Sequence, residues 1–287
     1  MSVICRDIRQ GPLFREAERL CESLRRPGRG EISDATDVQV DSAGKQALFT
    51  GSILETLTTA PITQIFSVDL ASGDVRPLTA GPNSDRHPRY SPDGRLVAFL
   101  SDRRKKGQFQ LYLQEVDSLS VHSTPAIQGM VEYLHWSPDG KRIVLSIAGF
   151  GSDRASVEGA VTIERPAEDQ PSWLPTVEVK QEDGGKRSLW IYELESNQAR
   201  EIKSPYNTWE AAWCGNQALV ALMSPGSSEA SWYGAKLHTV QVDNGTTREI
   251  YSPGHQVGCV SGHPSGRCVA CVEATCSDRG EIGRAHV

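Results

Sequence analysis

The turn sequence Ser-Pro-Asp-Gly occurs twice in the chain with similar flanks. "RYSPDGRLVAFLS" spans residues 89–101 and "HWSPDGKRIVLSI" spans residues 135–147. Proline presets φ at the first turn position, aspartate accepts main-chain hydrogen bonds, and glycine adopts a positive φ without a Cβ penalty. An apolar run rich in strand-forming residues follows each turn. Each copy therefore predicts a strand, a tight turn and a second strand.

A second kind of hairpin follows these turns along the chain. It consists of an alternating strand, a polar turn and another strand. It recurs in residues 64–79, 109–125, 188–202 and 236–250. In the last of these, Asn244-Gly245 is a strong signal for a two-residue turn. The repeating unit therefore has four strands.

The turns of the first hairpins recur along most of the chain. They fall at Ala43-Gly44, Asp93-Gly94, Asp139-Gly140, Gly215-Asn216 and Ser265-Gly266. A period of about 40–50 residues with four strands per unit is typical of a β-propeller. We predict an all-β fold in residues 31–280, an incomplete ring with four four-stranded, WD40-like blades and the start of a fifth. A polar insertion between about Phe150 and Arg187 lengthens one repeat.

The segment before the blades, residues 1–30, has a different pattern. Residues 12–26 carry apolar side chains at helical spacing: Leu13, Ala17, Leu20 and Leu24. Pro12 suits a first helical turn. A propeller core has no place for this stripe. We expect it to pack on the outside of the blades, or on another domain or subunit.

Composition excludes several classes of partner. The net charge of −6 gives no basic face for nucleic acid. The run Arg103–Lys106 precedes Gly107 between two expected strands, so we interpret it as a solvated loop. No apolar stretch reaches the roughly 20 residues that span a bilayer, and the N-terminus lacks a signal-peptide core. We therefore predict a cytoplasmic protein that does not contact membranes.

The cysteines also bear on cofactors. Four of the seven lie close together in the sequence, at Cys259, Cys268, Cys271 and Cys276. Zinc ribbons use two CxxC-like knuckles separated by a longer loop. Here a single CxxC lies in an apolar run, where its cysteines would point to opposite faces of a strand. We predict buried structural thiols, with neither a metal nor another cofactor.

No catalytic constellation is visible. The chain lacks Gly-x-Ser-x-Gly, HExxH and an HxH pair. His87 and His135 precede the repeated turns, where we expect a structural role. We therefore predict no catalytic, cofactor-binding or metal-binding residue. The insertion is either a disordered excursion or a rim loop with Arg154, Glu158 or Trp173 as ligand contacts.

The residues at this point resemble a known family. "RHPRYSPDGRLVAFLSDR" followed by "QLYL" is similar to the blade repeat of two kinds of propeller, those of prolyl-oligopeptidase-type (S9) serine peptidases and that of TolB. "SLWIYEL" and the N-terminal helix favour acylaminoacyl-peptidase-like and dipeptidyl-peptidase-like members. The resemblance implies that the propeller precedes an α/β-hydrolase domain with a Ser-Asp-His triad. It also implies that the propeller admits only short or unstructured peptides.

The chain departs from that family because it contains no hydrolase domain, so no catalytic residue can be transferred. Residues 281–287, "EIGRAHV", fit no blade strand and read as an in-frame translation of a sequencing adapter. We interpret them as an artificial end; a natural short C-terminus is the alternative.

We therefore predict a substrate-gating propeller of a cytoplasmic S9 peptidase, inactive alone. Its partners would be peptide substrates, the hydrolase domain and, in a homo-oligomer, a second copy of the chain. One alternative is a TolB-like, non-catalytic interaction propeller. Another is a propeller hydrolase with a metal in its channel. It would need carboxylates and histidines on the innermost strands, where we expect mostly Val, Ile, Leu and Phe.

An interrupted propeller should aggregate or form oligomers in solution. An open set of blades leaves strand edges and apolar faces uncovered, which favours association. We expect the chain expressed alone to be poorly soluble or oligomeric in size-exclusion chromatography. A sharp monomer peak with a cooperative melt would contradict an interrupted ring.

Overall fold

The computed structural model describes residues 9, 11–25, 32–53, 61–150, 152, 185–275 and 282–286. The chain divides into two compact units, Met1–Pro88 and Arg89–Val287. The described strands form four sheets of four strands and one of three, and within each sheet the strands follow chain order. These findings confirm the prediction of an all-β fold built from four-stranded sheets. The domain boundaries expected near residues 30 and 280 lie outside the described residues.

The first unit contains one helix and the first sheet. Its elements are α1 (Pro12–Arg25), β1 (Ile32–Val40), β2 (Gln46–Ile53), β3 (Ile62–Asp69) and β4 (Val75–Pro77). The rings of Phe49 and Phe66 stack at 5.5 Å across β2 and β3. Ile53 completes this buried cluster.

Helix α1 confirms the predicted helix to within one residue. However, Leu13 is 80% and Leu20 is 60% exposed. The expectation that the apolar stripe packs on the blades is therefore wrong for these two residues. Packing on another domain or subunit stays a prediction.

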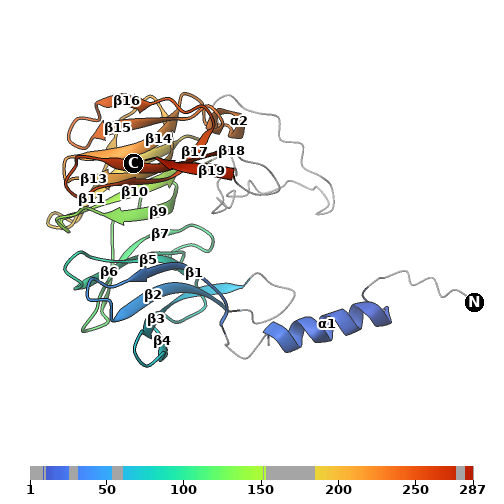
Figure 1. Ribbon diagram of the computed structural model, residues 1–287. Helices are drawn as coiled ribbons and strands as arrows, with labels where there is room; N and C mark the ends of the chain where they lie inside the picture. Colours follow the sequence, from blue (N-terminus) through green and yellow to red (C-terminus); the bar gives the residue numbers. More distant parts are fainter. Residues whose placement is uncertain are drawn as a thin grey trace, which may run out of the picture. The chain divides into compact units, whose positions relative to one another are not determined.

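The other four sheets fall in the second unit, except that β5 crosses the unit boundary. The second sheet comprises β5 (Asp85–Tyr90), β6 (Leu96–Ser101), β7 (Gln110–Glu115) and β8 (Val121–Ser123). The third comprises β9 (Met130–Trp136), β10 (Arg142–Ala148), β11 (Arg187–Glu193) and β12 (Gln198–Ile202). The fourth comprises β13 (Asn207–Cys214), β14 (Ala218–Ser224), β15 (Lys236–Gln241) and β16 (Thr247–Tyr251), with α2 (Glu229–Trp232) between β14 and β15. The fifth comprises β17 (Gln256–Gly262), β18 (Val269–Thr275) and β19 (Ile282–His286). Figure 1 shows these strands in sequence colours.

Apolar clusters fill the spaces between successive sheets of the second unit. Strand β10 shows how one strand serves two of them. Ile143 and Leu145 join the cluster shared with the preceding sheet, whereas Val144 joins the cluster shared with the following sheet. Because successive side chains point to opposite faces, a strand buried on both faces needs a continuous apolar run.

The two Ser-Pro-Asp-Gly turns have the same hydrogen bonds. In the second copy, the Ser137 hydroxyl donates to Asp139 Oδ1 at 2.6 Å and accepts from the Arg142 N–H at 2.9 Å. Asp139 Oδ1 also accepts from the Lys141 N–H at 3.1 Å. The first copy repeats these three bonds with the same distances. The glycines of all five first hairpins have φ between 66° and 73°, at residues 44, 94, 140, 215 and 266.

Tryptophans join neighbouring sheets near these turns. Trp136 Nε1 donates to the Arg89 carbonyl at 3.0 Å, and Trp213 Nε1 donates to the His135 carbonyl at 2.9 Å. Each bond runs from the end of one first strand to the first strand of the preceding sheet. The tryptophan before the turn therefore ties the third sheet to the second and the fourth sheet to the third.

The C-terminal segment differs from our expectation. We expected residues 281–287 to form no strand, but Ile282–His286 form β19, which pairs antiparallel with β18. The physical reason is that an edge strand presents main-chain donors and acceptors to any extended segment, whatever its side chains. Among the described residues, neither helix is long and apolar enough to cross a membrane.

The turn carboxylate should contribute measurably to stability. Burial acts to raise the pKa of Asp139, but the bonds from Ser137 and Lys141 outweigh it and hold the pKa below its ordinary value. Asp139→Ala should therefore lower the free energy of unfolding by about 1–2 kcal/mol at neutral pH. Urea denaturation measures the loss.

The pH dependence and a control sharpen this test. A lowered folded-state pKa gives stability that is complete above the ordinary carboxyl pKa, about 3.9, and is lost as pH falls through the folded-state value. The deficit of the variant should therefore shrink in acid. Asp117→Ala, in the turn between β7 and β8, is the matched control. An equal loss in the control would contradict the role of the repeated turn.

Candidate functional site

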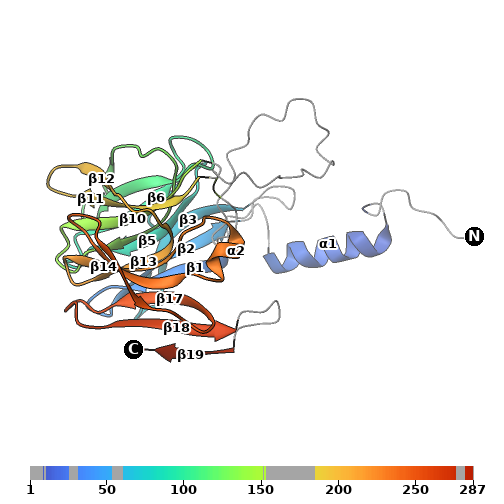
Figure 2. The ribbon, with the colours of Figure 1, turned by 90° about the horizontal axis from the view of Figure 1, so that it is seen from above.

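The first strands of successive sheets lie side by side in the second unit. β9 contacts β13, and β13 contacts β17; Figure 2 shows the latter pair. In a propeller such strands line the central channel. Here they carry partly exposed Tyr133, His135 and Glu210. We use the name inner edge for the partly exposed side chains of β9, β13 and β17, which include Tyr133, His135 and Glu210.

The expectation that innermost strands carry mostly Val, Ile, Leu and Phe is therefore wrong. Those residues lie on the second and third strands, whose two faces are both covered by neighbouring sheets. First strands have one free edge and carry polar side chains there. Even so, no three Cys, His, Asp or Glu side chains among the described residues are grouped to hold a metal ion.

β-bulges interrupt the first strands. The register shifts in β1 between Thr36 and Gln39 and in β17 between Gly258 and Ser261. In β9 the pairing skips Glu132, and in β13 it skips Trp209. Bulges re-aim side chains and are common beside functional sites.

Three non-glycine residues of the first strands adopt positive φ. Asp37, His87 and Cys259 have φ of 54°, 58° and 56°. Each lies seven residues before the turn glycine of its own sheet, at 44, 94 and 266. Sequence reasoning missed this position, although aligning the repeats on their turn glycines would have revealed a polar residue or cysteine there.

In the first unit, two of these residues share one hydroxyl. Thr50 Oγ1 donates to Asp37 Oδ2 at 2.9 Å and accepts from the His87 N–H at 3.0 Å. His87 Nδ1 lies 3.4 Å from Asp37 Oδ1, and the side chain of His87 is 6% exposed. This arrangement gives His87 a structural partner. It also holds together Asp37 and His87, two residues whose main chain has a positive φ.

In the second unit, a buried ion pair lies at the opposite end of β9 from the turn. Arg187 Nε and Nη2 donate to the Glu132 carboxylate at 2.9–3.2 Å. Their side chains are 0% and 4% exposed. The guanidinium also stacks 5.3 Å from the Trp209 ring, and the Arg187 N–H donates to Asn207 Oδ1 at 2.7 Å. The two bulged residues, Glu132 and Trp209, therefore meet at one arginine.

That arginine ends the long insertion. Near the base of the insertion, the Gly149 N–H donates to the Lys186 carbonyl at 3.1 Å, and Ser152 Oγ donates to the Gly185 carbonyl at 2.7 Å. A Cβ on Gly185 would lie 2.5 Å from the Phe150 carbonyl, so this close approach requires glycine. The buried ion pair and these bonds hold together the two ends of the chain that flank the insertion. Its expected ligand contacts, Arg154, Glu158 and Trp173, lie outside the described residues.

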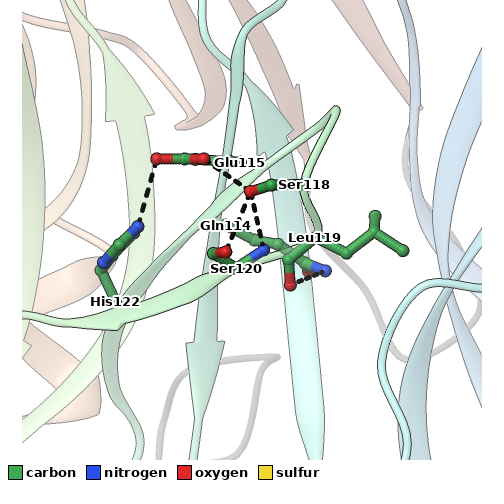
Figure 3. Close-up of polar contacts among 6 residues, drawn as sticks. All are labelled: Gln114, Glu115, Ser118, Leu119, Ser120 and His122. Carbon is green, nitrogen blue, oxygen red and sulfur yellow. Dashed lines mark hydrogen bonds and ion pairs between the residues drawn. The ribbon is translucent and has the colours of Figure 1, made fainter.

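One exposed cluster has the residue types of a hydrolase triad (Figure 3). Ser118 Oγ donates to Glu115 Oε2 at 2.5 Å, and His122 Nε2 lies 3.4 Å from Glu115 Oε1. The Ser118 hydroxyl and then His122 lower the pKa of Glu115. A triad requires the imidazole to take the proton of the serine. Here the carboxylate lies between them, so the cluster caps the β7–β8 hairpin and cannot activate the serine.

The cysteines are only partly as expected. Cys271 is buried, and burial and then Glu273 and Glu210 raise the pKa of its thiol. Cys259 and Cys268 are exposed, so the expectation of buried thiols is wrong for these two. Cys259 is displaced by its bulge, and Cys268 precedes β18 at the turn. Cys276 lies outside the described residues.

Removing one member of the Glu132–Arg187 ion pair should destabilise the fold strongly, whereas replacing both members with apolar residues should destabilise it little. Arg187→Met leaves a buried carboxylate uncompensated, which should cost about 3–5 kcal/mol in the free energy of unfolding. The double variant Glu132→Leu/Arg187→Met should recover most of that loss, because no charge stays buried. A double-mutant cycle by urea denaturation measures the coupling. Equal losses in the single and double variants would contradict this account.

The chain was compared with known proteins by sequence and by structure. No protein-family model matches the chain. A Bacillus subtilis protein named "uncharacterized peptidase YuxL" is 30% identical over 149 residues, which are 52% of this chain and 21% of that protein. The chain therefore spans about a fifth of this relative.

Two solved structures share the fold. TolB from Acinetobacter baumannii matches 88% of this chain and 51% of its own, with a TM-score of 0.56 and 13% identity. Acylaminoacyl peptidase from Pyrococcus horikoshii matches 83% of this chain and 35% of its own, with a TM-score of 0.54 and 14% identity. At such identity the likeness establishes the fold. The chain therefore has the β-propeller fold that it shares with TolB and with acylaminoacyl peptidase.

Proposed function

We propose that this chain is the substrate-gating propeller of an S9-type serine peptidase. The observation that carries the proposal is the shared blade fold with acylaminoacyl peptidase, which extends over most of this chain and about a third of that enzyme. The Bacillus relative, also named a peptidase, supports the same reading. The propeller would be one part of a longer enzyme.

The catalytic groups would come from an α/β-hydrolase domain of that enzyme. An activated serine would attack the peptide carbonyl, and water would release the acyl group. The Ser118, Glu115 and His122 cluster cannot supply this chemistry, because its imidazole contacts the carboxylate instead of the hydroxyl. The propeller would contribute selection of substrates by size.

The second unit suits a rigid gate. Continuous apolar clusters join its successive sheets, and tryptophan hydrogen bonds tie neighbouring first strands. A rigid channel wall excludes folded proteins but admits an extended peptide. On the inner edge, Tyr133 and His135 are partly exposed and their rings lie 5.7 Å apart, so they would offer aromatic faces to such a peptide.

Helix α1 would contribute to domain docking. Leu13, Phe14 and Leu20 are all exposed. An exposed apolar stripe on a helix favours a protein partner. In the proposed enzyme, the hydrolase domain would cover it.

Activity of the full reading frame tests the proposal. The full-length product should cleave short peptides, lose activity with a serine-reactive fluorophosphonate and leave folded proteins intact. His135→Ala should change the ratio of kcat/KM between long and short peptides by about three- to tenfold, equivalent to roughly 0.6–1.4 kcal/mol. His122→Ala, on the exposed strand β8, is the matched control and should leave the ratio unchanged.

The TolB likeness supports one alternative, a non-catalytic interaction propeller. In that case the full-length product would show no serine-dependent turnover with any peptide. It would instead bind a protein partner. Absence of labelling by the fluorophosphonate would overturn the peptidase proposal.

A further inference from the structure

Two cysteines from neighbouring sheets meet beside the turns of the second unit. Cys214 ends β13, and Cys268 immediately precedes β18. They are 54 residues apart in sequence, yet Cys214 Sγ lies 3.7 Å from the Cys268 carbonyl oxygen. Cys214 is 8% exposed, whereas Cys268 is exposed to solvent. One thiol is therefore accessible to a reagent, and the other is buried against the main chain of the first.

The main chain holds this contact closely. The Gly215 N–H donates to the His263 carbonyl at 3.1 Å, from the fourth sheet to the fifth. A Cβ on Gly262 would lie 2.9 Å from the Cα of Cys214, and one on Gly215 would lie 3.2 Å from the Cα of Gly266. Such close approach leaves little freedom for the two segments to separate.

The surroundings distinguish this pair from the other described cysteines. Burial raises the pKa of the Cys214 thiol, and Cys268 raises it further because two thiolates repel one another. The pKa of Cys271 is raised instead by burial and by two glutamates. The electrostatic coupling agrees with the geometry in pairing Cys214 with Cys268.

We propose that Cys214 and Cys268 are a redox-active pair whose reversible disulfide cross-links the fourth and fifth sheets. A low-molecular-weight disulfide, such as oxidised glutathione, is the oxidant. The exposed Cys268 thiolate attacks it, forming a mixed disulfide and releasing one glutathione thiolate. Cys214, as a thiolate, then attacks the Cys268 sulfur and releases the second glutathione. The two protein thiols are oxidised by two electrons, the glutathione disulfide is reduced to two thiols, and the two protons pass to solvent and the released thiolates.

The cross-link would act on the seam between these sheets. Disulfide formation requires Cα atoms about 4.4–6.8 Å apart. The contact of Cys214 Sγ with the Cys268 carbonyl oxygen brings the two main chains close together. A covalent bond at the turn end would prevent the fifth sheet from separating from the fourth. Oxidation would thus stabilise this seam independently of any peptidase activity.

Thiol mapping of the purified full chain tests the proposal. After oxidised glutathione, the intact mass should fall by two hydrogen atoms. Two of the seven thiols should become unreactive toward a thiol reagent. Proteolysis without reductant should release one peptide pair joined through Cys214 and Cys268. Dithiothreitol should restore the original mass, and the oxidised chain should have a higher urea midpoint.

Two variants separate the pair from other thiols. Cys268→Ser, at an exposed position, should abolish the internal cross-link and the rise in midpoint. Cys259→Ser, at another exposed cysteine, should leave both unchanged. A stable glutathione adduct on Cys268 without a cross-link would overturn the proposal, as would a cross-link that survives in Cys268→Ser. Since none of these readouts uses catalysis, failure of the peptidase proposal would leave the result interpretable.

Discussion

The packing of one sheet against the next is the constraint on which the second unit depends. Its middle strands bury both faces, so alternate side chains must be apolar toward two different neighbours. In β14, Leu219 and Ala221 face the third sheet, while Val220 and Leu222 face the fifth. Polar residues are thereby displaced to the strand ends, the outer hairpins and the free edge of each first strand. The polar character of the inner edge is a consequence of this division.

The two ends of the seam between the third and fourth sheets are held by different forces. At the turn end, Trp213 donates to a main-chain carbonyl, and Arg142 lies over its ring at 5.2 Å. At the opposite end, the buried Glu132–Arg187 pair stacks on Trp209. Burying two charges requires good hydrogen bonding to offset desolvation, which the bidentate contact supplies. Arg187 also ends the insertion, so the same ion pair holds the seam and the C-terminal end of the insertion.

Local chemistry in the sequence was enough to predict the blades. Turn glycines, proline and alternating strands act over a few residues, and all five predicted first turns carry a glycine at positive φ. The candidate site depends instead on contacts between distant segments. Glu132 and Arg187 are 55 residues apart, with the insertion between them, and neither belongs to a local motif. Likewise, the pairing of β19 depends on an available strand edge, and the exposure of Cys259 depends on a bulge that shifts its strand.

The central claim is that these blades serve a peptidase. The reading frame downstream of these blades at the source locus tests it most directly, by amplification and sequencing. The account predicts further blades and then Gly-x-Ser-x-Gly at a strand-turn-helix, with an aspartate and a histidine downstream. A stop codon after residue 287, or blades alone, would contradict it and leave a binding propeller as the function.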